Sequence, residues 1–487
     1  MQKCKGSVIV KLTIGNVTGN VTKKRIKSFS AFAAGLKDSR IKRRKMNMKK
    51  RWIVTAGAAI LAAAALTGCS SGGSSDAPKV YYLNFKPEVT DVWEEIAEVY
   101  TQETGVEVKV VTAAGGNYES TLKSEIAKTD APTLFQINGP VGYQSWKDYC
   151  LDLTDTDFYN ALTDKNLAIT GEDGGVYGVP YTVEGYGIIY NGEIMDQYFA
   201  MDGAKVSSID EINSFDTLKA VVEDMQSKKD ALGIEGVFAS TSLLPGEEWR
   251  WQTHLANLPI NAEFEDKGVT DADTIEFTYS DNFKQIFDLY LNNSTTEPTL
   301  LGSKGVNDSM AEFALGQAAM VQNGNWAWSQ IADVSGNVVK EDSIGFLPIY
   351  MGLEGEENQG LCVGTENYFC INSQAREVDQ QASLDFVWWL INSETGKDYM
   401  TNRLGNIAPF TTFSDDERPS DPLAQALLTS MESGKESIPW IFTAFPSQTF
   451  KDNFGSALLE YAQGTMTWDQ VKETVIEQWQ IEKEAAK

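Results

Sequence analysis

The sequence has almost no histidine and little cysteine, and both shortages exclude classes of site. His254 is the only histidine among 487 residues, so metal sites built from several histidines are excluded, and a Ser-His-Asp triad would have to use this residue. Because it stands in the run "WRWQTHLANL", we expect a structural role for it. Five cysteines, at positions 4, 69, 150, 362 and 370, contain no C-x-x-C pair. We expect Cys362 and Cys370 to be buried free thiols, with a disulfide across neighbouring strands as the alternative.

The motifs of common enzymes are also missing. The chain contains no Walker A sequence, no G-x-S-x-G, no H-E-x-x-H and no G-x-G-x-x-G after a strand. Pairs of carboxylates are inevitable by chance among 68 Asp and Glu, so such pairs indicate nothing by themselves. We therefore expect a protein that is not an enzyme and that binds no cofactor or metal.

Basic residues are scarce after position 68. Residues 1–68 contain sixteen of the 41 Lys and Arg and a single acid, Asp38, so that 25 basic residues face 67 acidic ones in the remainder. A surface this acidic repels nucleic acid and anionic lipid headgroups, which argues against DNA or RNA as a partner. The charge indicates high solubility, with attraction of a cationic ligand as the alternative.

The N-terminal region has the pattern of a secretion signal that ends in a lipid-attachment site. Three basic residues (49–51) precede an apolar stretch of 15 residues (52–66), which is shorter than the ~20 residues that span a bilayer as a helix. The lipobox "LTGC" then ends at Cys69, the expected attachment point of a diacylglycerol. An ordinary cleaved signal or a short core helix is the alternative.

A flexible tether follows this cysteine. The stretch "SSGGSSDAP" is of the Gly/Ser type, suited to holding a domain off a membrane. Two acyl chains on one cysteine anchor a protein stably. We expect residues 1–68 to be leader and lipoprotein signal peptide, residues 69–78 to be tether, and the protein to be lipid-anchored on the extracellular face of the cell membrane.

A β-α-β unit is predicted at the start of the mature chain. The strand "VYYLNF" is followed by a helical pattern with Asp91 as its N-cap and Gly105 as its end, and then by the period-two strand "VEVKVV". Such a unit implies a parallel sheet with helices on its faces. A second buried strand lies within 131–139. Because ligands of open α/β sheets bind beyond the carboxyl ends of strands, the loops 85–88 and 138–143 are candidate binding loops.

Further elements are predicted along the rest of the chain. The segment "GGVYGVPYTVEGYGIIYN" predicts a turn and a long strand, broken at Gly185 and Gly187, where a backbone can bend or approach something closely. From 214 to 329 helices and short strands alternate, which predicts a second α/β lobe. The tail is predicted to be helical, and Thr467 and Gln470 fit a capping box.

Several segments, taken in order, resemble one family. They are the lipobox, "YTQETGVEVKV", "DGGVYGVPYTVEGYGIIYN", "FALGQAAMVQNGNWAWS" and "SIGFLPIYMG". Together they resemble the family 1 extracellular solute-binding proteins of ABC importers, over about residues 80–487. The most specific piece is F-x-x-G-x-x-A-M-x-x-x-G-x-W, from Phe313 to Trp326. The resemblance implies an α/β, two-lobed periplasmic-binding-protein-like fold with a hinge and an interlobe cleft.

The resemblance also implies an organisation and partners. Lobe 1 is expected from residues 79–182 plus 349–409, and lobe 2 from residues 183–348 plus 410–487. A sugar or oligosaccharide is the expected ligand, permease subunits of an ABC transporter are the expected protein partners, and the chain is expected to be a monomer. A polyamine or peptide ligand on the same scaffold, or a surface glycosidase that uses two acids, is the alternative.

The family's cleft residues match particular positions of this sequence. Its cleft carboxylate matches Glu184, for which a solvated hinge acid is the alternative role. Its cleft tryptophan matches Trp326. A C-terminal stacking aromatic falls on Phe445, with Trp440 as the alternative. Flat aromatic rings suit the C–H faces of a pyranose, and carboxylates suit its hydroxyls.

Three loops complete the expected site. The aromatic loop "EEWRWQTHL" offers Trp249 and Trp251. At the first strand's loop the family's Asp-Lys pair is replaced by Lys86, Pro87 and Glu88. At the second strand's loop the aspartate-arginine pair is absent, and the loop offers Asn138 and Tyr143. These departures imply a ligand different from that of the maltodextrin-binding members.

Two tryptophans of "NGNWAWS" are expected to have different roles. If Asn325 caps a helix whose first turn holds both, their side chains point roughly 200° apart. The resemblance then implies that Trp326 faces the cleft, while Trp328 packs into the second lobe. In an extended strand both indoles would lie on one face.

Overall fold

A computed structural model describes residues 77–113 and 117–486. The described residues belong to one compact unit. Cys69, the signal peptide and most of the tether lie outside the described residues. Within the described part of the chain, no helix combines the length and the apolar composition needed to cross a membrane.

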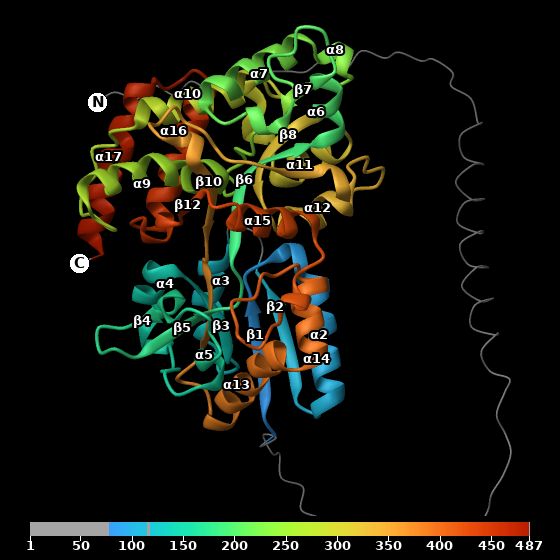
Figure 1. Cartoon of the computed structure of the whole chain (residues 1–487). Coiled ribbons are helices and arrows are strands. Elements are labelled where there is room, and N and C mark those ends of the chain that lie inside the picture. Colours follow the sequence, from blue (N-terminus) through green and yellow to red (C-terminus); the bar gives the residue numbers. More distant parts are fainter. Residues whose placement is uncertain (1–76, 114–116, 487) are drawn as a thin grey trace, which may run out of the picture. The chain divides into compact units, whose positions relative to one another are not determined.

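The first lobe is built on a six-stranded sheet of order β2-β1-β3-β11-β5-β4 (Figure 1). Its strands are β1 (Lys79–Asn84), β2 (Glu107–Thr112), β3 (Leu134–Asn138), β4 (Ile169–Thr170), β5 (Val176–Pro180) and β11 (Asn367–Ile371). Its helices are α2 (Thr90–Thr104), α3 (Tyr118–Ile126), α4 (Gly139–Trp146), α5 (Asp157–Asn160), α13 (Glu377–Asn392) and α14 (Glu394–Asp398). Strands β1 and β2 are connected by α2 and pair with each other in parallel, which confirms the predicted β-α-β unit.

Helix α2 shows how local sequence sets an element. Its buried face carries Trp93, Ile96 and Tyr100 at helical spacing, packed on the sheet. The helix ends as predicted at Gly105, whose φ of +77° is the left-handed conformation that glycine tolerates. The prediction of Asp91 as N-cap was wrong. A 3-10 turn, η1 (Pro87–Val89), runs directly into the helix, so Asp91 lies inside its first turn.

The second lobe is built on a sheet of order β12-β10-β6-β8-β7, with β9 also paired to β6. Its strands are β6 (Glu184–Asn191), β7 (Gly236–Phe238), β8 (Ala318–Gly324), β9 (Ile344–Leu347), β10 (Gln359–Gly364) and β12 (Glu436–Pro439). Its helices are α6 (Gly192–Phe199), α7 (Phe215–Ser227), α8 (Lys229–Leu232), α9 (Ala256–Lys267), α10 (Ser280–Asn292), α11 (Val306–Ala314), α12 (Ala327–Ala332), α15 (Pro422–Glu432), α16 (Gln448–Ala462) and α17 (Trp468–Ala485). The predicted capping box of Thr467 and Gln470 begins α17.

Two glycines of β6 allow close packing and do not break the strand. A Cβ at Gly185 would lie 2.4 Å from Leu427 of α15, and one at Gly187 would lie 2.5 Å from the carbonyl oxygen of Leu347 in β9. The predicted break at these glycines was wrong, because β6 continues through both; the interruption falls before Glu184. The expected close approach is confirmed.

The chain crosses between the lobes three times. The first crossing joins β5 to β6, and the second joins β10 to β11. This second crossing lies later in the chain than the expected boundary at 348/349, because residues 359–364 pair with the second sheet. The third crossing lies between Phe410, which is buried in the first lobe's core, and Leu423, which is buried in the second lobe's.

The described cysteines are buried free thiols, as expected. Cys362 lies on β10 and Cys370 on β11, in different sheets, and Cys150 packs with Cys370 in the first lobe. Burial raises the pKa of the Cys362 thiol to about 12. A protonated thiol is a poor nucleophile, so Cys362 behaves as a small apolar core residue.

Candidate functional site

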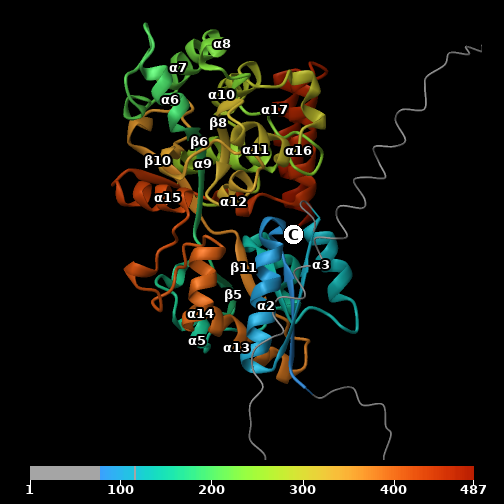
Figure 2. The same ribbon diagram turned by 90° about the vertical axis from the view of Figure 1, so that its right-hand side faces the viewer.

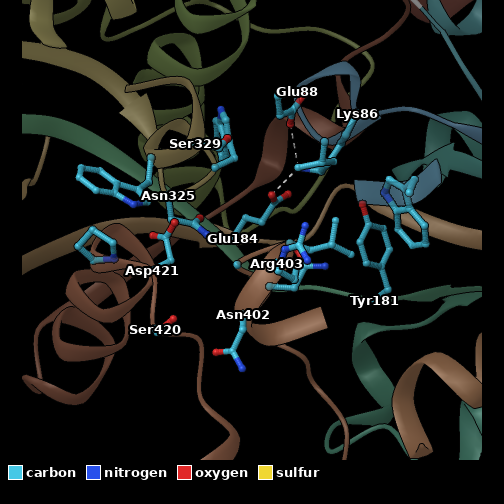
Figure 3. Close-up of a pocket in the computed structure, with 18 of the residues that line it drawn as sticks. Lys86, Glu88, Tyr181, Glu184, Asn325, Ser329, Asn402, Arg403, Ser420 and Asp421 are labelled. Carbon is cyan, nitrogen blue, oxygen red and sulfur yellow. Dashed lines mark hydrogen bonds and ion pairs between the residues drawn. The ribbon is translucent and has the colours of Figure 1, made fainter. Parts of the chain in front are cut away.

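A cavity of about 280 Å³ lies between the two lobes (Figure 3). The first lobe contributes residues from the loop after β1, from α2, from the first crossing and from the segment 402–406. The second lobe contributes the start of β6, the start of α12 and the start of α15, which lie side by side in Figure 2. The lining residues are Lys86, Glu88, Val89, Trp93, Tyr181, Glu184, Asn325, Trp326, Trp328, Ser329, Glu341, Asn402, Arg403, Leu404, Gly405, Asn406, Ser420, Asp421 and Pro422.

A buried ion pair joins the lobes at this cavity. The ammonium of Lys86 donates to Glu184 Oε1 at 2.5 Å and lies 3.9 Å from Glu88 Oε1. Only 11% of the Lys86 side chain and 5% of the Glu184 side chain are exposed. Burial raises the pKa of Glu88, against the lowering effect of the Lys86 and Arg250 charges.

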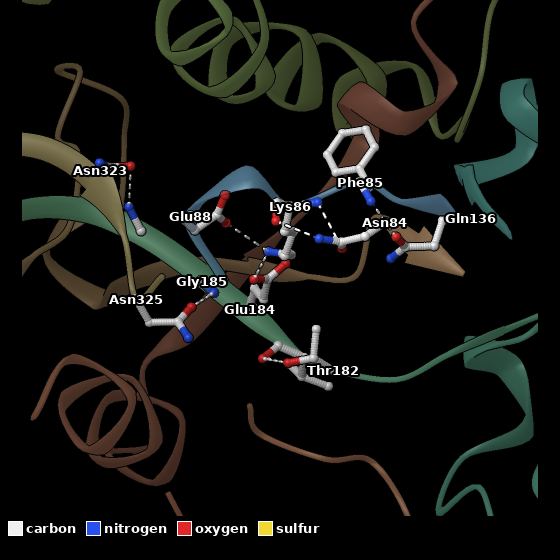
Figure 4. A network of polar contacts seen from close by, with 12 residues as sticks. Asn84, Phe85, Lys86, Glu88, Gln136, Thr182, Glu184, Gly185, Asn323 and Asn325 are labelled. Atoms are coloured by element: carbon white, nitrogen blue, oxygen red, sulfur yellow. Dashed lines mark hydrogen bonds and ion pairs between the residues drawn. The ribbon is translucent and has the colours of Figure 1, made fainter. Parts of the chain in front are cut away.

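Side-chain amides hold both ends of this pair in place (Figure 4). Asn84 at the end of β1 donates to the carbonyl oxygen of Lys86 at 2.7 Å and accepts from its backbone N–H at 3.1 Å. On the second lobe, Asn325 Oδ1 accepts from the N–H of Gly185 at 2.9 Å, and the N–H of Asn325 donates back to Gly185 O at 3.0 Å. These contacts hold the start of β6 against Asn325, the residue that precedes Trp326.

An aromatic cluster extends from the cavity into the second lobe. The ring of Trp326 lies 6.1 Å from that of Trp249 and 6.3 Å from that of Trp440. His254 stacks on Tyr186 with ring centroids 4.2 Å apart. Burial, followed by the nearby cations, lowers the pKa of His254 well below its usual range, so this histidine is neutral at pH 7. A neutral, stacked ring supports the structural role expected for it.

Arg250 is a buried cation whose side chain has no hydrogen-bond partner among the described residues. It is 1% exposed, its guanidinium lies 3.8 Å from the centroid of the Trp249 ring, and none of its three side-chain nitrogens has a hydrogen-bond partner there. Burial lowers its pKa to about 9. The indole nitrogens of Trp93 and Trp440 are also buried without a partner. Unpaired buried donors cost free energy, so an acceptor from a ligand or from water would stabilise this region.

The structure brings together four of the nine expected binding residues. The cavity is lined by Lys86, Glu88, Glu184 and Trp326. Trp249 does not line it, but its ring packs against that of Trp326. Trp328 also lines the cavity while packing on a buried cluster of the second lobe, because α12 begins at Ala327. The expected capping by Asn325 was wrong, since its side chain binds Gly185.

The other four expected residues lie elsewhere. Trp251 and Phe445 are buried in the core of the second lobe, 3% and 1% exposed. Tyr143 stacks on Tyr177 with ring centroids 5.2 Å apart. Asn138 donates to Glu366 Oε1 at 2.7 Å, near the contact of α4 with η11 (Ile441–Ala444). Among the described residues, no group of His, Cys, Asp and Glu is arranged to hold a metal ion.

Sequence reasoning missed the lining residues that lie shortly before and within the third crossing. They are Asn402, Arg403, Asn406, Ser420 and Asp421. No local pattern marks them, because they reach the cavity only after the chain has returned from α14 to α15. The ring of Trp93 packs in the core of the first lobe and also lines the cavity.

Asp421 provides a pH-dependent test of the cavity wall. It caps α15, and burial raises the pKa of its carboxyl from 3.8 to about 6. Since the folded pKa is the higher one, the folded state holds the proton more tightly, and the stability that this group contributes falls as pH rises from about 4 to above 6. Asp421→Asn keeps a capping oxygen without the titration.

We therefore expect Asp421→Asn to gain stability relative to the unsubstituted protein as pH rises from about 4.5 to 7.5. Urea denaturation at both pH values measures this. A stability difference that does not change with pH would contradict the expected titration.

Comparisons with known proteins agree with this geometry. The family model of the bacterial extracellular solute-binding proteins matches residues 95–426. Among solved structures, a complex of the solute-binding protein RafE with raffinose is 17% identical, with a TM-score of 0.64, and covers 83% of this chain and 99% of that one. A search of curated proteins found no match.

Two further solved structures share the fold. A chitin oligosaccharide binding protein is 19% identical with a TM-score of 0.65, covering 85% of this chain and 100% of that one. Maltose-bound MalE3 of T. maritima is 15% identical with a TM-score of 0.63, covering 83% of this chain and 100% of that one. At these identities the likeness shows the two-lobed fold alone. Because the family model matches more than half of the chain, this protein belongs to the bacterial extracellular solute-binding proteins.

Proposed function

We propose that this protein captures an oligosaccharide between its lobes and delivers it to the permease of an ABC importer. The observation that carries the proposal is the composition of the interlobe cavity. It presents the ring of Trp326 beside the carboxylates of Glu88 and Glu184, the ammonium of Lys86 and the amide of Asn325. A flat ring packs on the C–H face of a sugar, and the polar groups can bind its hydroxyls.

The hinge and the anchor are part of the same proposal. Three crossings join the lobes, so a rotation about them would open and close the cavity on its ligand. We propose that Cys69 carries the lipid that holds the protein on the outer face of the membrane, and membrane fractionation of the full chain tests this.

A thermal-shift panel on residues 70–487 tests the ligand class. The panel contains raffinose, maltose and chitin oligosaccharides, which appear with the similar structures, together with spermidine and a peptide. A ligand at 100 times its Kd stabilises a fold by about 2.7 kcal/mol, which is visible in Tm. Stabilisation by spermidine or the peptide and by no glycan would overturn the sugar assignment. Oligosaccharide cleavage on long incubation would instead favour a glycosidase.

We expect Trp326→Ala to weaken binding of the best glycan about 100-fold, because the substitution removes the stacking surface. Isothermal titration calorimetry measures the change. Trp389→Ala is the matched control: this tryptophan is also half-buried, but it lies on α13 of the first lobe, with its ring against Tyr100 of α2, away from the cavity. Equal losses in the two variants would contradict the role of Trp326.

A further inference from the structure

We propose that the Lys86 side chain fills an ammonium-binding site built into the interlobe cavity, and that it thereby restricts the cavity to ligands without positive charge. This inference rests on the proposed function for the ligand class, but the ammonium site itself does not depend on which solute is bound. It would make Lys86 a specificity-determining residue.

Three groups converge on the Lys86 ammonium. Glu184 Oε1 accepts from it at 2.5 Å, Glu88 Oε1 lies 3.9 Å away, and the centroid of the Trp326 ring lies 5.5 Å away. Two carboxylates and an aromatic face are the groups that recognise an organic ammonium ion. Figure 3 shows Glu88 and Glu184 on either side of Lys86 at one end of the cavity.

The backbone segments that carry the groups around the ammonium are held by contacts that do not involve the Lys86 side chain. The backbone of Lys86 is bound on both its N–H and its carbonyl oxygen by Asn84. Glu184 begins β6, whose next residue, Gly185, is bonded twice to Asn325. Removing the lysine side chain therefore leaves the carboxylates of Glu88 and Glu184 (Figure 4) and the indole of Trp326 around the space that its ammonium filled.

The charge of Lys86 explains why this arrangement favours neutral ligands. A second cation entering the cavity would be repelled by the Lys86 ammonium at short range. The side chains of Lys86, Glu88 and Glu184 are at most 12% exposed, so water and salt screen this repulsion only weakly. Hydroxyl groups meet no such repulsion, because they can accept from Lys86 and donate to the carboxylates. The acidic lining of the cavity thus does not by itself select for a polyamine.

Chemical rescue tests the site directly. Lys86→Ala removes four heavy atoms, which n-propylammonium restores as a separate ion. We expect n-propylammonium chloride to raise the Tm of Lys86→Ala saturably, by about 2 °C or more beyond the effect of equal NaCl. Neutral 1-propanol should not do so. The unsubstituted protein, and Lys219→Ala, which breaks an exposed i,i+4 pair with Glu223, should show no saturable rise.

A second variant keeps the apolar stem and tests selectivity. We expect Lys86→Met to bind spermidine at least about tenfold more tightly than the unsubstituted protein does, and to bind neutral glycans less tightly. The inference is overturned if propylammonium does not rescue Lys86→Ala and Lys86→Met gains no affinity for spermidine. If no glycan binds the unsubstituted protein, the proposed function fails, while a positive rescue still establishes the ammonium site.

Discussion

Phe445→Ala is expected to destabilise the protein by about 3 to 4 kcal/mol and to leave ligand affinity within about twofold. The sequence resemblance places this residue in the binding cleft, but the structure places it in the second lobe's core, 1% exposed. Its ring meets those of Phe450 and Trp479 edge-on, with centroids 5.8 and 5.3 Å apart. Truncation would leave a cavity between η11 and the helices α16 and α17, which cannot collapse without moving both.

Urea denaturation and calorimetric titration together measure this prediction. Phe445→Leu serves as the matched control, since it keeps most of the volume and should cost less than about 1.5 kcal/mol. Trp326→Ala should show the reverse pattern, a large loss of affinity and a small loss of stability. A tenfold or greater loss of affinity in Phe445→Ala, with stability unchanged, would return this residue to the cleft and contradict the packing of η11.

Glu184→Ala is expected to destabilise the protein by about 2 to 3 kcal/mol. Removing one member of a buried pair leaves the other charge without compensation, which typically costs more than the pair contributes. This expected loss of stability is small for the breaking of a buried ion pair. The reasons are that Glu88 remains 3.9 Å from the Lys86 ammonium and that 11% of the lysine side chain is exposed to solvent. The loss concerns stability and is measured in the absence of any ligand.

A double-mutant cycle isolates the pair. Glu184→Ala combined with Lys86→Met should recover at least about 1 kcal/mol relative to the sum of the single changes, because neither the Lys86 ammonium nor the Glu184 carboxylate is then left without the other. Replacement of Glu193, an exposed acid whose partner is Lys340, is the control and should change stability by less than about 1 kcal/mol. Additive effects at positions 86 and 184 would show that the lobes are not joined through this contact.

Local sequence was sufficient to predict the elements that depend on neighbouring residues. The β-α-β unit follows from a period of two, then 3.6, then two, and Gly105 ends the helix because glycine alone adopts a positive φ there without strain. The capping box of Thr467 and Gln470 lies within one turn of α17 and was predicted for the same reason. Likewise, the expectation of free thiols required only the spacing and number of the cysteines.

Tertiary structure alone decided which aromatic residues face the cavity. The residues next to Trp249, Trp251, Trp326 and Phe445 in the sequence do not show which of these rings faces the cavity. Two are core residues, one lines the cavity and one packs against the ring that lines it. Periodicity shows that a side chain lies on one face of a helix, but what covers that face depends on segments far away in the chain.

The same reasoning applies to the charges and crossings. Lys86 and Glu184 are 98 residues apart, and nothing near either one predicts their contact, because it exists only where the end of β1 and the start of β6, in different sheets, meet at the same cavity. The second crossing after β10 and the lining residues of the third crossing were missed for this reason too. The sequence by itself determined the family, the two α/β lobes, the end of α2 at Gly105 and the capping box of α17, since these depend on short-range pattern. Only the tertiary structure decided the cavity's lining, because the lining is assembled from segments that meet solely through folding.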